Sequence, residues 1–469
     1  MGYNLHDIKV IGLDLLNVLY CRLEGTLGEH SSMELHAFIE KKDDFLYDLP
    51  SYHPVELQVH GDAGTIILFS GIVTEISFES SSEMSIVKIK GKSYSWLMDL
   101  TKKSRSFQDI QMGCTAFLNC VMADYPGSSI FYAAQEMPIG KLIVQYEETD
   151  WQFLKRVFSM AGLTITPYEY QAGIKLYAGI PLLSENQIPY QIREMDKDME
   201  SYYRLKANGR PVHVSDFTRY QVSSQQLLRL FDTVEVNGLP FTIYSYVYDF
   251  RSQEMIGIYG LQSAQGLSVS TVYPMHLIGV ALTGKVVNVS GTKVQVALEI
   301  DRDSGNPAVF WFPYSTMSAS PNGSGWYCMP EIGDAVRIYF PSKNEQEAIA
   351  LSSVSNYPAP QGGGTDRMQD PNTRYLRTKA GQELALTPEL MILSCGGGIS
   401  SVTILNDGTI TVNAQQKVLV DATGPVTLHA EENLTVQAQE LISLQSLQGG
   451  KVSLGGAQIE LSGTEVKID

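Results

Sequence analysis

The sequence predicts a mainly β protein with two β-barrels and a helical insert, a small third barrel, and a C-terminal intertwined trimeric β-helix, or prism. Three observations support this class. Short runs with alternating apolar residues, the period of β-strands, fill most of the chain up to Val354. Helical spacing is clear only between residues 101 and 170. After Val402, apolar pairs recur every eight residues, and a repeat of fixed period indicates units that stack on one another.

Length and charge limit the domain count and the partners. A chain of 469 residues is expected to hold roughly two to four domains. Charged residues make up 18% of the chain and glycine is abundant, with 40 residues, which suits a β-rich protein with many turns. The net charge of −17 argues against nucleic acid as a partner and against docking on an anionic membrane.

Cysteine usage and the N-terminal residues indicate synthesis in the cytoplasm. The chain has five cysteines and no C-x-x-C pair, so neither a disulfide framework nor a zinc site is expected. The first residues lack the basic and apolar regions of a secretory signal, and no apolar run reaches the roughly 18 residues of a membrane-spanning helix. We therefore expect a protein made in the cytoplasm without a signal peptide.

Residues 1–100 are predicted to form the first β-barrel. Val55, Leu57 and Val59 alternate with polar residues, residues 61–64 supply a glycine-containing turn, and residues 66–73 return as a second strand. Successive hairpins of this kind are typical of an all-β barrel.

Residues 101–170 are predicted to form the helical insert. Residues 112–122 show helical spacing. A second helix is expected to begin at Thr149, whose side chain can form a capping box with Gln152. Gly162 is expected to end that helix, because glycine readily adopts the backbone conformation found just after a helix.

Residues 171–277 are predicted to form the second β-barrel, and residues 278–355 a compact five-stranded barrel with the strand spacing of an OB fold. No strongly basic cluster lies on the small barrel, so a nucleic-acid role is not supported. Residues 356–375, rich in proline and glycine, are expected to be a linker. The strands expected in the small barrel cover residues 284–289, 293–300, 309–313, 335–340 and 347–354.

Residues 376–469 are predicted to form a spike built on eight-residue repeats. One octad supplies only a short strand and a corner, so a coil closes either with three octads of one chain or with one octad from each of three chains. The three-chain prism is favoured because six regular octads would give only about two coils of a single chain. A plain antiparallel β-domain is the remaining alternative. The positions assigned to the core of the prism are Val402, Ile404, Ile410, Val412, Val418, Val420, Val426, Leu428, Leu434, Val436, Ile442 and Leu444.

No group of residues stands out as a catalytic site. Glu147, Glu148 and Asp150 are clustered, and a glycosidase needs a carboxylate pair. However, acidic residues at the start of a helix also stabilise the helix dipole, and this structural interpretation is preferred. The eight histidines are scattered without metal-ligand spacing, and the common nucleophile, phosphate-loop and zinc-protease motifs are missing. We therefore expect no enzyme activity, no cofactor and no metal site.

Five stretches, in order, resemble the VgrG family of spike proteins. Residues 69–75, 105–109 and 144–156 are similar to the hub of that family, residues 329–340 to the end of its OB barrel, and the octad tail to its needle. VgrG proteins are similar to a phage baseplate hub fused to its central spike, with relatives in type VI secretion, tailocins and extracellular injection systems. The resemblance implies a structural homotrimer that joins the tube and baseplate proteins of a contractile injection machine to a membrane-piercing needle. Such a spike works in an assembled particle, delivered outside the cell or into a target cell.

The sequence departs from some members of that family. Too few residues separate Val354 from the first octads for the lysozyme domain that some phage spikes carry. The tail has one histidine, His429, and no H-x-H, so the histidine-ligated iron site of some spikes is not expected. No effector domain follows the needle before Asp469, so a toxin is expected to be a separate protein.

The last repeats are predicted to bind a tip protein. Three copies of Val466 and Ile468 would form a blunt platform with unpaired strand groups, which invites a partner that adds strands. The docking site for this partner is assigned to Ile459, Leu461, Val466 and Ile468 within residues 459–469. In the resembled family this partner is a conical PAAR-type protein that can carry effector cargo. The alternatives are a glycan-degrading or cell-wall-hydrolysing tail spike enzyme, and a plain adhesin or fibre. No aromatic residue follows Tyr375, which counts against a sugar-binding enzyme.

Overall fold

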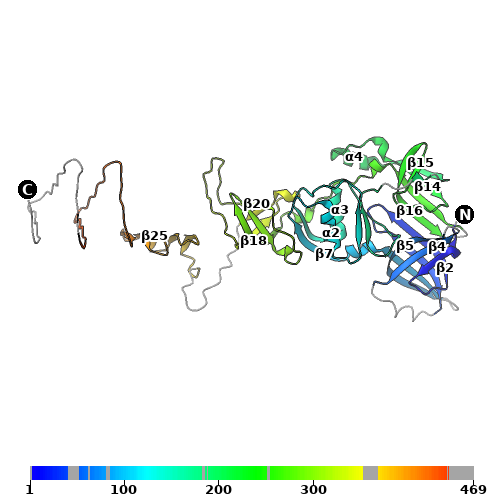
Figure 1. The fold of residues 1–469 in the computed structure, drawn as a ribbon, viewed down its shortest axis with the longest axis horizontal. Coiled ribbons are helices and arrows are strands. Elements are labelled where there is room, and N and C mark those ends of the chain that lie inside the picture. The colour runs from blue at the N-terminus through cyan, green and yellow to red at the C-terminus, as the bar shows by residue number, and fades with distance from the viewer. Residues whose placement is uncertain are drawn as a thin grey trace, which may run out of the picture. The chain divides into compact units, whose positions relative to one another are not determined.

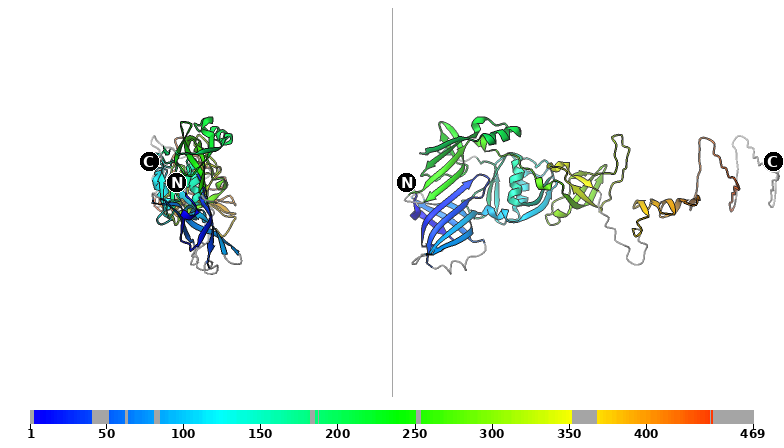
Figure 2. Two further views of the ribbon diagram at one scale, coloured as in Figure 1. Left: turned by 90° about the vertical axis from the view of Figure 1, so that its right-hand side faces the viewer. Right: turned by 180° about the vertical axis from the view of Figure 1, so that it is seen from behind.

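The computed structural model describes residues 3–40, 52–61, 64–80, 85–181, 185–186, 188–250, 254–351, 368–440 and residue 442. The chain divides into two compact units, Met1–Asn356 and Tyr357–Asp469. The first unit holds one 12-stranded sheet, a helical layer and a small barrel. We call the two halves of this sheet the first and the second barrel, after the two barrels predicted from the sequence. Figures 1 and 2 show that the helical layer, with α2 and α3, lies between the fused barrels and the small barrel.

The first barrel is built from strands that pair antiparallel in the order β1-β4-β5-β6-β3-β2. Met33, Leu35 and Ala37 of β3 are buried at alternate positions, as expected for a strand with one face on a core. The hairpin expected around residues 61–64 is the β4–β5 pair. The elements are η1 (Leu5–Asp7), β1 (Ile8–Ile11), β2 (Asn17–Thr26), β3 (Ser32–Ile39), β4 (Pro54–Gly61), β5 (Gly64–Ser80), β6 (Ser85–Ser93) and η2 (Tyr94–Asp99).

The second barrel continues the same sheet, because β16 pairs antiparallel with β2. Tyr246 lies opposite Gly25 in this seam, and a Cβ atom at position 25 would lie 2.3 Å from the Tyr246 ring, so the close approach requires glycine. The two barrels share one hydrophobic core. The elements are β12 (Glu185–Asn186), β13 (Gln191–Lys197), α4 (Met199–Ala207), η3 (Val214–Phe217), β14 (Thr218–Ser224), β15 (Thr233–Val236), β16 (Leu239–Phe250), β17 (Ile256–Gln262), η4 (Ala264–Leu267) and η5 (Met275–Leu277).

The helical layer packs around an aromatic core in which the rings of Phe117 and Phe153 meet edge to face. Helix α3 has the expected capping box, because the Thr149 side chain accepts from the Gln152 backbone and the Gln152 side chain accepts from the Thr149 backbone. Gly162 follows with a φ of +77°. The elements are β7 (Lys102–Phe107), α2 (Cys114–Met122), β8 (Ser129–Tyr132), β9 (Ile143–Thr149), α3 (Asp150–Ser159), β10 (Ile165–Pro167) and β11 (Lys175–Ala178).

The small barrel has five antiparallel strands in the order β20-β19-β18-β21-β22. Its core includes Phe312 and Val336 together with Leu142 and Val144 from the helical layer, so the small barrel and that layer share one hydrophobic cluster. The elements are β18 (Ala281–Ser290), β19 (Lys293–Leu298), η6 (Glu299–Asp301), β20 (Trp311–Pro313), β21 (Ala335–Tyr339), η7 (Glu345–Glu347) and β22 (Ile349–Leu351).

The second unit begins with an antiparallel meander of β23 to β27. Two octads form its last hairpin, where Val402 lies opposite Val412 and Ile404 opposite Ile410. Between residues 417 and 440 the structure describes no strand. The trimeric β-helix expected over residues 376–469 is therefore not confirmed, and in the described residues the first part of this unit is antiparallel, the alternative left open by the sequence. The strands are β23 (Arg374–Arg377), β24 (Glu383–Leu386), β25 (Leu390–Cys395), β26 (Ser400–Leu405) and β27 (Ile410–Ala414).

Candidate functional site

The meander in the second unit has one apolar face. The strand register aligns Leu376, Leu384, Leu393, Val402 and Val412 in a single row across five strands. Because successive side chains of a strand point to opposite faces, positions two residues away share the face of this row.

A second apolar row runs beside the first. It consists of Leu386, Met391, Ile404 and Ile410, which the same pairings place opposite one another. The opposite face is more polar along the last two strands, where Thr403 pairs with Thr411. We call the two apolar rows the meander face.

The meander face is bare in the single chain. Leu393 is 50% exposed, Val412 57% and Ile410 66%. A groove of about 580 Å³ runs over the face and is lined by Leu384, Leu393, Val402 and Val412. Contiguous exposed apolar side chains mark a surface that another molecule covers.

The apolar residues of the later octads are also exposed. Seven of the predicted core positions between Val418 and Ile442 lie 51% to 74% exposed. They are Val418, Val420, Val426, Leu428, Leu434, Val436 and Ile442. The structure brings Val402, Ile404, Ile410 and Val412 together and leaves these seven unpaired with any strand in the described residues. Leu444 and the predicted tip residues Ile459, Leu461, Val466 and Ile468 lie outside the described residues.

A second feature of interest, in the first unit, is the buried contact between the helical layer and the small barrel. Arg156 of α3 has a side chain only 2% exposed. Its guanidinium donates to both carboxylate oxygens of Glu148, at 2.7 and 2.8 Å, and to the Val144 carbonyl at 2.7 Å. Its remaining nitrogen donates to Glu345 of the small barrel at 3.3 Å.

Glu345 completes this contact from the barrel side. Its Oε1 also accepts from the Val144 backbone N–H at 2.9 Å. Burial raises the pKa of Glu345, although Arg156 and the Val144 N–H stabilise the carboxylate. A buried arginine with two carboxylates and a carbonyl has nearly all its donors matched, which is the condition for a buried ion pair to hold.

A separate set of hydrogen bonds joins β7 and the residue after it to the small barrel. Both carboxylate oxygens of Asp301 accept from Ser106, one from its backbone N–H and one from its hydroxyl, each at 2.5 Å. Asn306 donates to the Ser106 carbonyl at 2.7 Å. Gln108 donates to the Val296 carbonyl at 3.1 Å. The barrel is therefore joined to the helical layer by hydrogen bonds at two places.

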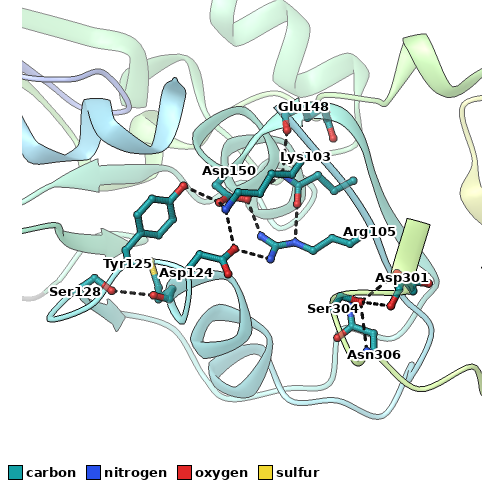
Figure 3. A network of polar contacts seen from close by, with 12 residues as sticks. Lys103, Arg105, Asp124, Tyr125, Ser128, Glu148, Asp150, Asp301, Ser304 and Asn306 are labelled. Carbon is teal, nitrogen blue, oxygen red and sulfur yellow. Dashed lines mark hydrogen bonds and ion pairs between the residues drawn. The ribbon is translucent and has the colours of Figure 1, made fainter. Parts of the chain in front are cut away.

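Two of the three clustered carboxylates predicted to be structural, Asp150 and Glu148, are held by cationic side chains. Asp150 is fully buried and accepts from Lys103 and Arg105 at 2.6 Å, and from the Tyr125 hydroxyl at 2.7 Å (Figure 3). Glu148 is held by Arg156. Glu147 is exposed on β9 and has a φ of 50°. Two of the three acids are thus engaged by cations, which leaves no paired free carboxyls at this place.

The described residues contain no cluster of three or more histidine, cysteine, aspartate or glutamate side chains suited to a metal ion. Within the same part of the chain, no helix is both long and apolar enough to cross a membrane.

Two family models match the chain. Residues 24–187 match the phage tail baseplate hub family (GPD), and residues 282–354 match the type VI secretion system/phage-baseplate injector OB domain. No curated protein sequence matches the chain. These matches confirm the predicted resemblance for the hub and OB domains.

Solved structures share the fold at low sequence identity. The E. coli c3393 protein, a component of the type VI secretion system with structural similarity to T4 bacteriophage tail proteins gp27 and gp5, is 13% identical, with 74% of this chain and 99% of that chain covered and a TM-score of 0.52. A chain of the lidded Francisella PdpA–VgrG complex is 9% identical, with 87% of this chain and 79% of that chain covered and a TM-score of 0.53.

Proposed function

We propose that this chain, which carries the hub domain of phage tail baseplates and the OB domain of type VI secretion and phage-baseplate injectors, is a structural hub and spike that works as a homotrimer. In this role the fused barrels attach to the tube and baseplate proteins of a contractile injection machine. The second unit forms the membrane-piercing needle of the assembled particle.

The bare meander face is the observation that carries the proposal. Chains with a net charge of −17 repel one another, so a surface with little charge favours self-contact. The two rows of the meander face contain Leu, Met, Val and Ile at every position named above, and the charged residue in register with them is Arg374, opposite Leu386 on the first strand. Three copies can cover these faces by placing them around a common threefold axis.

The size of the face indicates that the octads must contribute as well. Five strands about 4.8 Å apart and about five residues long span roughly 400 Å². A stable interface needs roughly 800 Å² per partner. The exposed octad residues that follow supply further apolar surface of the same kind, and winding three chains together there would pair their strand groups and hide their apolar side chains.

The buried contact between the helical layer and the small barrel suits a part that transmits force. A spike pushed along its axis must not bend between the hub and the needle. Arg156 and Ser106 each join the helical layer to the small barrel through hydrogen bonds, and these contacts would pass axial load from one part to the other.

We further propose a PAAR-type tip protein, with effector cargo, at residues 459–469. The support is the apolar sequence of the last repeats. The Francisella relative is described in a complex with a second protein, PdpA, which favours a spike that carries partners. A glycan-degrading role gains no support, because the tail has no aromatic residue after Tyr375 to hold a sugar.

The test is the mass of the purified full-length protein by light scattering. A mass of three times 51.8 kDa that persists on dilution is expected. A monomer at micromolar concentration would overturn the proposal, because the bare meander face would then need no partner.

A further inference from the structure

The long loop between β20 and β21 is uncharged and exposes large apolar side chains. No charged residue occurs between Asp303 and Glu331. Met317 is 87% exposed, Tyr327 74% and Trp326 46%. The loop extends well beyond the small barrel (Figure 2). A long loop that keeps such residues in water is expected to meet another molecule.

The loop has a defined shape of its own. Ala319 and Gly325 form an antiparallel bridge, and the Trp326 N–H donates to the Ser318 carbonyl at 2.8 Å. Gly325 has a φ of +138°, and a Cβ atom there would lie 2.4 Å from the Ser318 carbonyl oxygen. An apolar surface that is already ordered loses little conformational entropy when it binds.

The root of the loop lies beside the strand from which the chain leaves the barrel. Tyr314 bridges Ala350 of β22, and the Ser315 N–H donates to the Ala350 carbonyl at 2.8 Å. The second unit follows β22 in the sequence. In a trimer joined through the second unit, each copy therefore carries this loop beside the strand that leads to the shared part of the trimer.

We infer that this loop, residues 316–330, is a contact between copies of the chain, in which Trp326 and Tyr327 of one protomer pack on the small barrel of its neighbour. This inference rests on the proposed trimer. Two observations favour a second copy of the chain as the molecule that this loop contacts. The loop carries none of the charge that makes two copies, each of net charge −17, repel one another. The loop also begins beside β22, the strand after which the chain leaves the small barrel. A closed ring needs such a contact between two different patches of one chain.

The test places a photoreactive benzoylphenylalanine at position 327 of the full-length protein, and at Tyr203 on α4 as a control of similar exposure, 63%. Irradiation of the 327 protein is expected to give dimer-sized products whose cross-linked peptides map to residues 282–351. Monomer-sized products linked to residues 368–442 would overturn the inference, as would an absence of products in a trimer established by light scattering. A monomer by light scattering would instead overturn the proposed function.

A second measurement follows subunit exchange between labelled trimers. Tyr327→Ser should speed exchange about tenfold, the effect of losing one large aromatic contact at an interface. Tyr203→Ser, a change of the same size on α4, should leave the rate unchanged. Equal rates for wild type and Tyr327→Ser would overturn the inference.

Discussion

Arg156 and Glu345, 189 residues apart in the sequence, meet in the buried interior with 3.3 Å between Nη1 and Oε1. The pair joins helix α3 of the hub to the OB barrel. It therefore makes the hub and the barrel interdependent, and this dependence can be measured.

Removal of Arg156 should destabilise the first unit strongly. Arg156→Met leaves Glu148 and Glu345 buried without their cation, and breaking a buried pair in this way costs about 3–5 kcal/mol. The free energy of unfolding, from urea denaturation of the full-length protein, should fall by that amount. Arg204→Ala removes an exposed ion pair with Glu200 and should change stability by less than about 0.5 kcal/mol. Equal effects of the two variants would show that the buried pair is not needed.

Glu345 should make the stability of the contact between helix α3 and the small barrel, which we call the junction, depend on pH. Its folded pKa is raised above the ordinary 4.5 by burial, so the folded chain holds this proton more tightly than the unfolded chain. Its contribution to stability is therefore fully present below pH 4.5 and is lost as the pH rises through the raised pKa. Glu345→Gln should be at least as stable as wild type at pH 7, with the difference vanishing towards pH 4.5.

The measurement is the urea midpoint of unfolding across this pH range. Glu345→Ala is the matched control, because it removes the acceptor of the Val144 N–H and should lower stability at every pH. A Gln variant that is less stable than wild type at pH 7 would contradict the assigned direction.

Local signals predicted local structure well. Thr149 and Gln152 indicated the start of α3, since a capping box depends only on residues three apart. The junction could not be predicted, because nothing in the residues around Arg156 indicates a partner in the OB barrel. Asp301 and Glu345 were missed for the same reason: their roles depend on long-range packing.

The needle shows the limit of periodicity. Val402, Ile404, Ile410 and Val412, which were assigned to the core of a prism, share one face of a hairpin in the single chain. The eight-residue period could not decide how the strands pair, since a strand followed by a short turn fits both a stacked coil and a hairpin. Leu384 and Leu393 were missed because they precede the regular repeats, and only the register shows that they share this face.

A charge on the meander face should abolish the trimer. Val412→Asp places three buried carboxylates near one axis, which self-association does not tolerate. Val412 is 57% exposed in the single chain, so the variant should fold normally. Thr411→Asp adds the same charge to the opposite face of β27, where Thr411 pairs with Thr403, and is the control. Light scattering should give a monomer for the first variant and a trimer for the second, and a trimer for both would exclude this face from the interface.

Cys395 allows the same face to be tested without adding charge. It follows Leu393 by two residues on β25 and lines the same groove, so its thiol lies at the edge of the meander face. If three faces surround one axis, three copies of this thiol come close together, and mild oxidation should link two of them. Gel electrophoresis without reductant should then show covalent dimers and one unlinked chain per trimer. The experiment is done in a chain that carries Cys328→Ser, so that the exposed thiol beside Tyr327 cannot link copies; there Cys395→Ser should remove the dimers, whereas Cys120→Ser, at an exposed thiol on the hub helix α2, should keep them. Dimers that survive Cys395→Ser, or a trimer that gives no dimers at all, would mean that the meander faces do not point towards the axis.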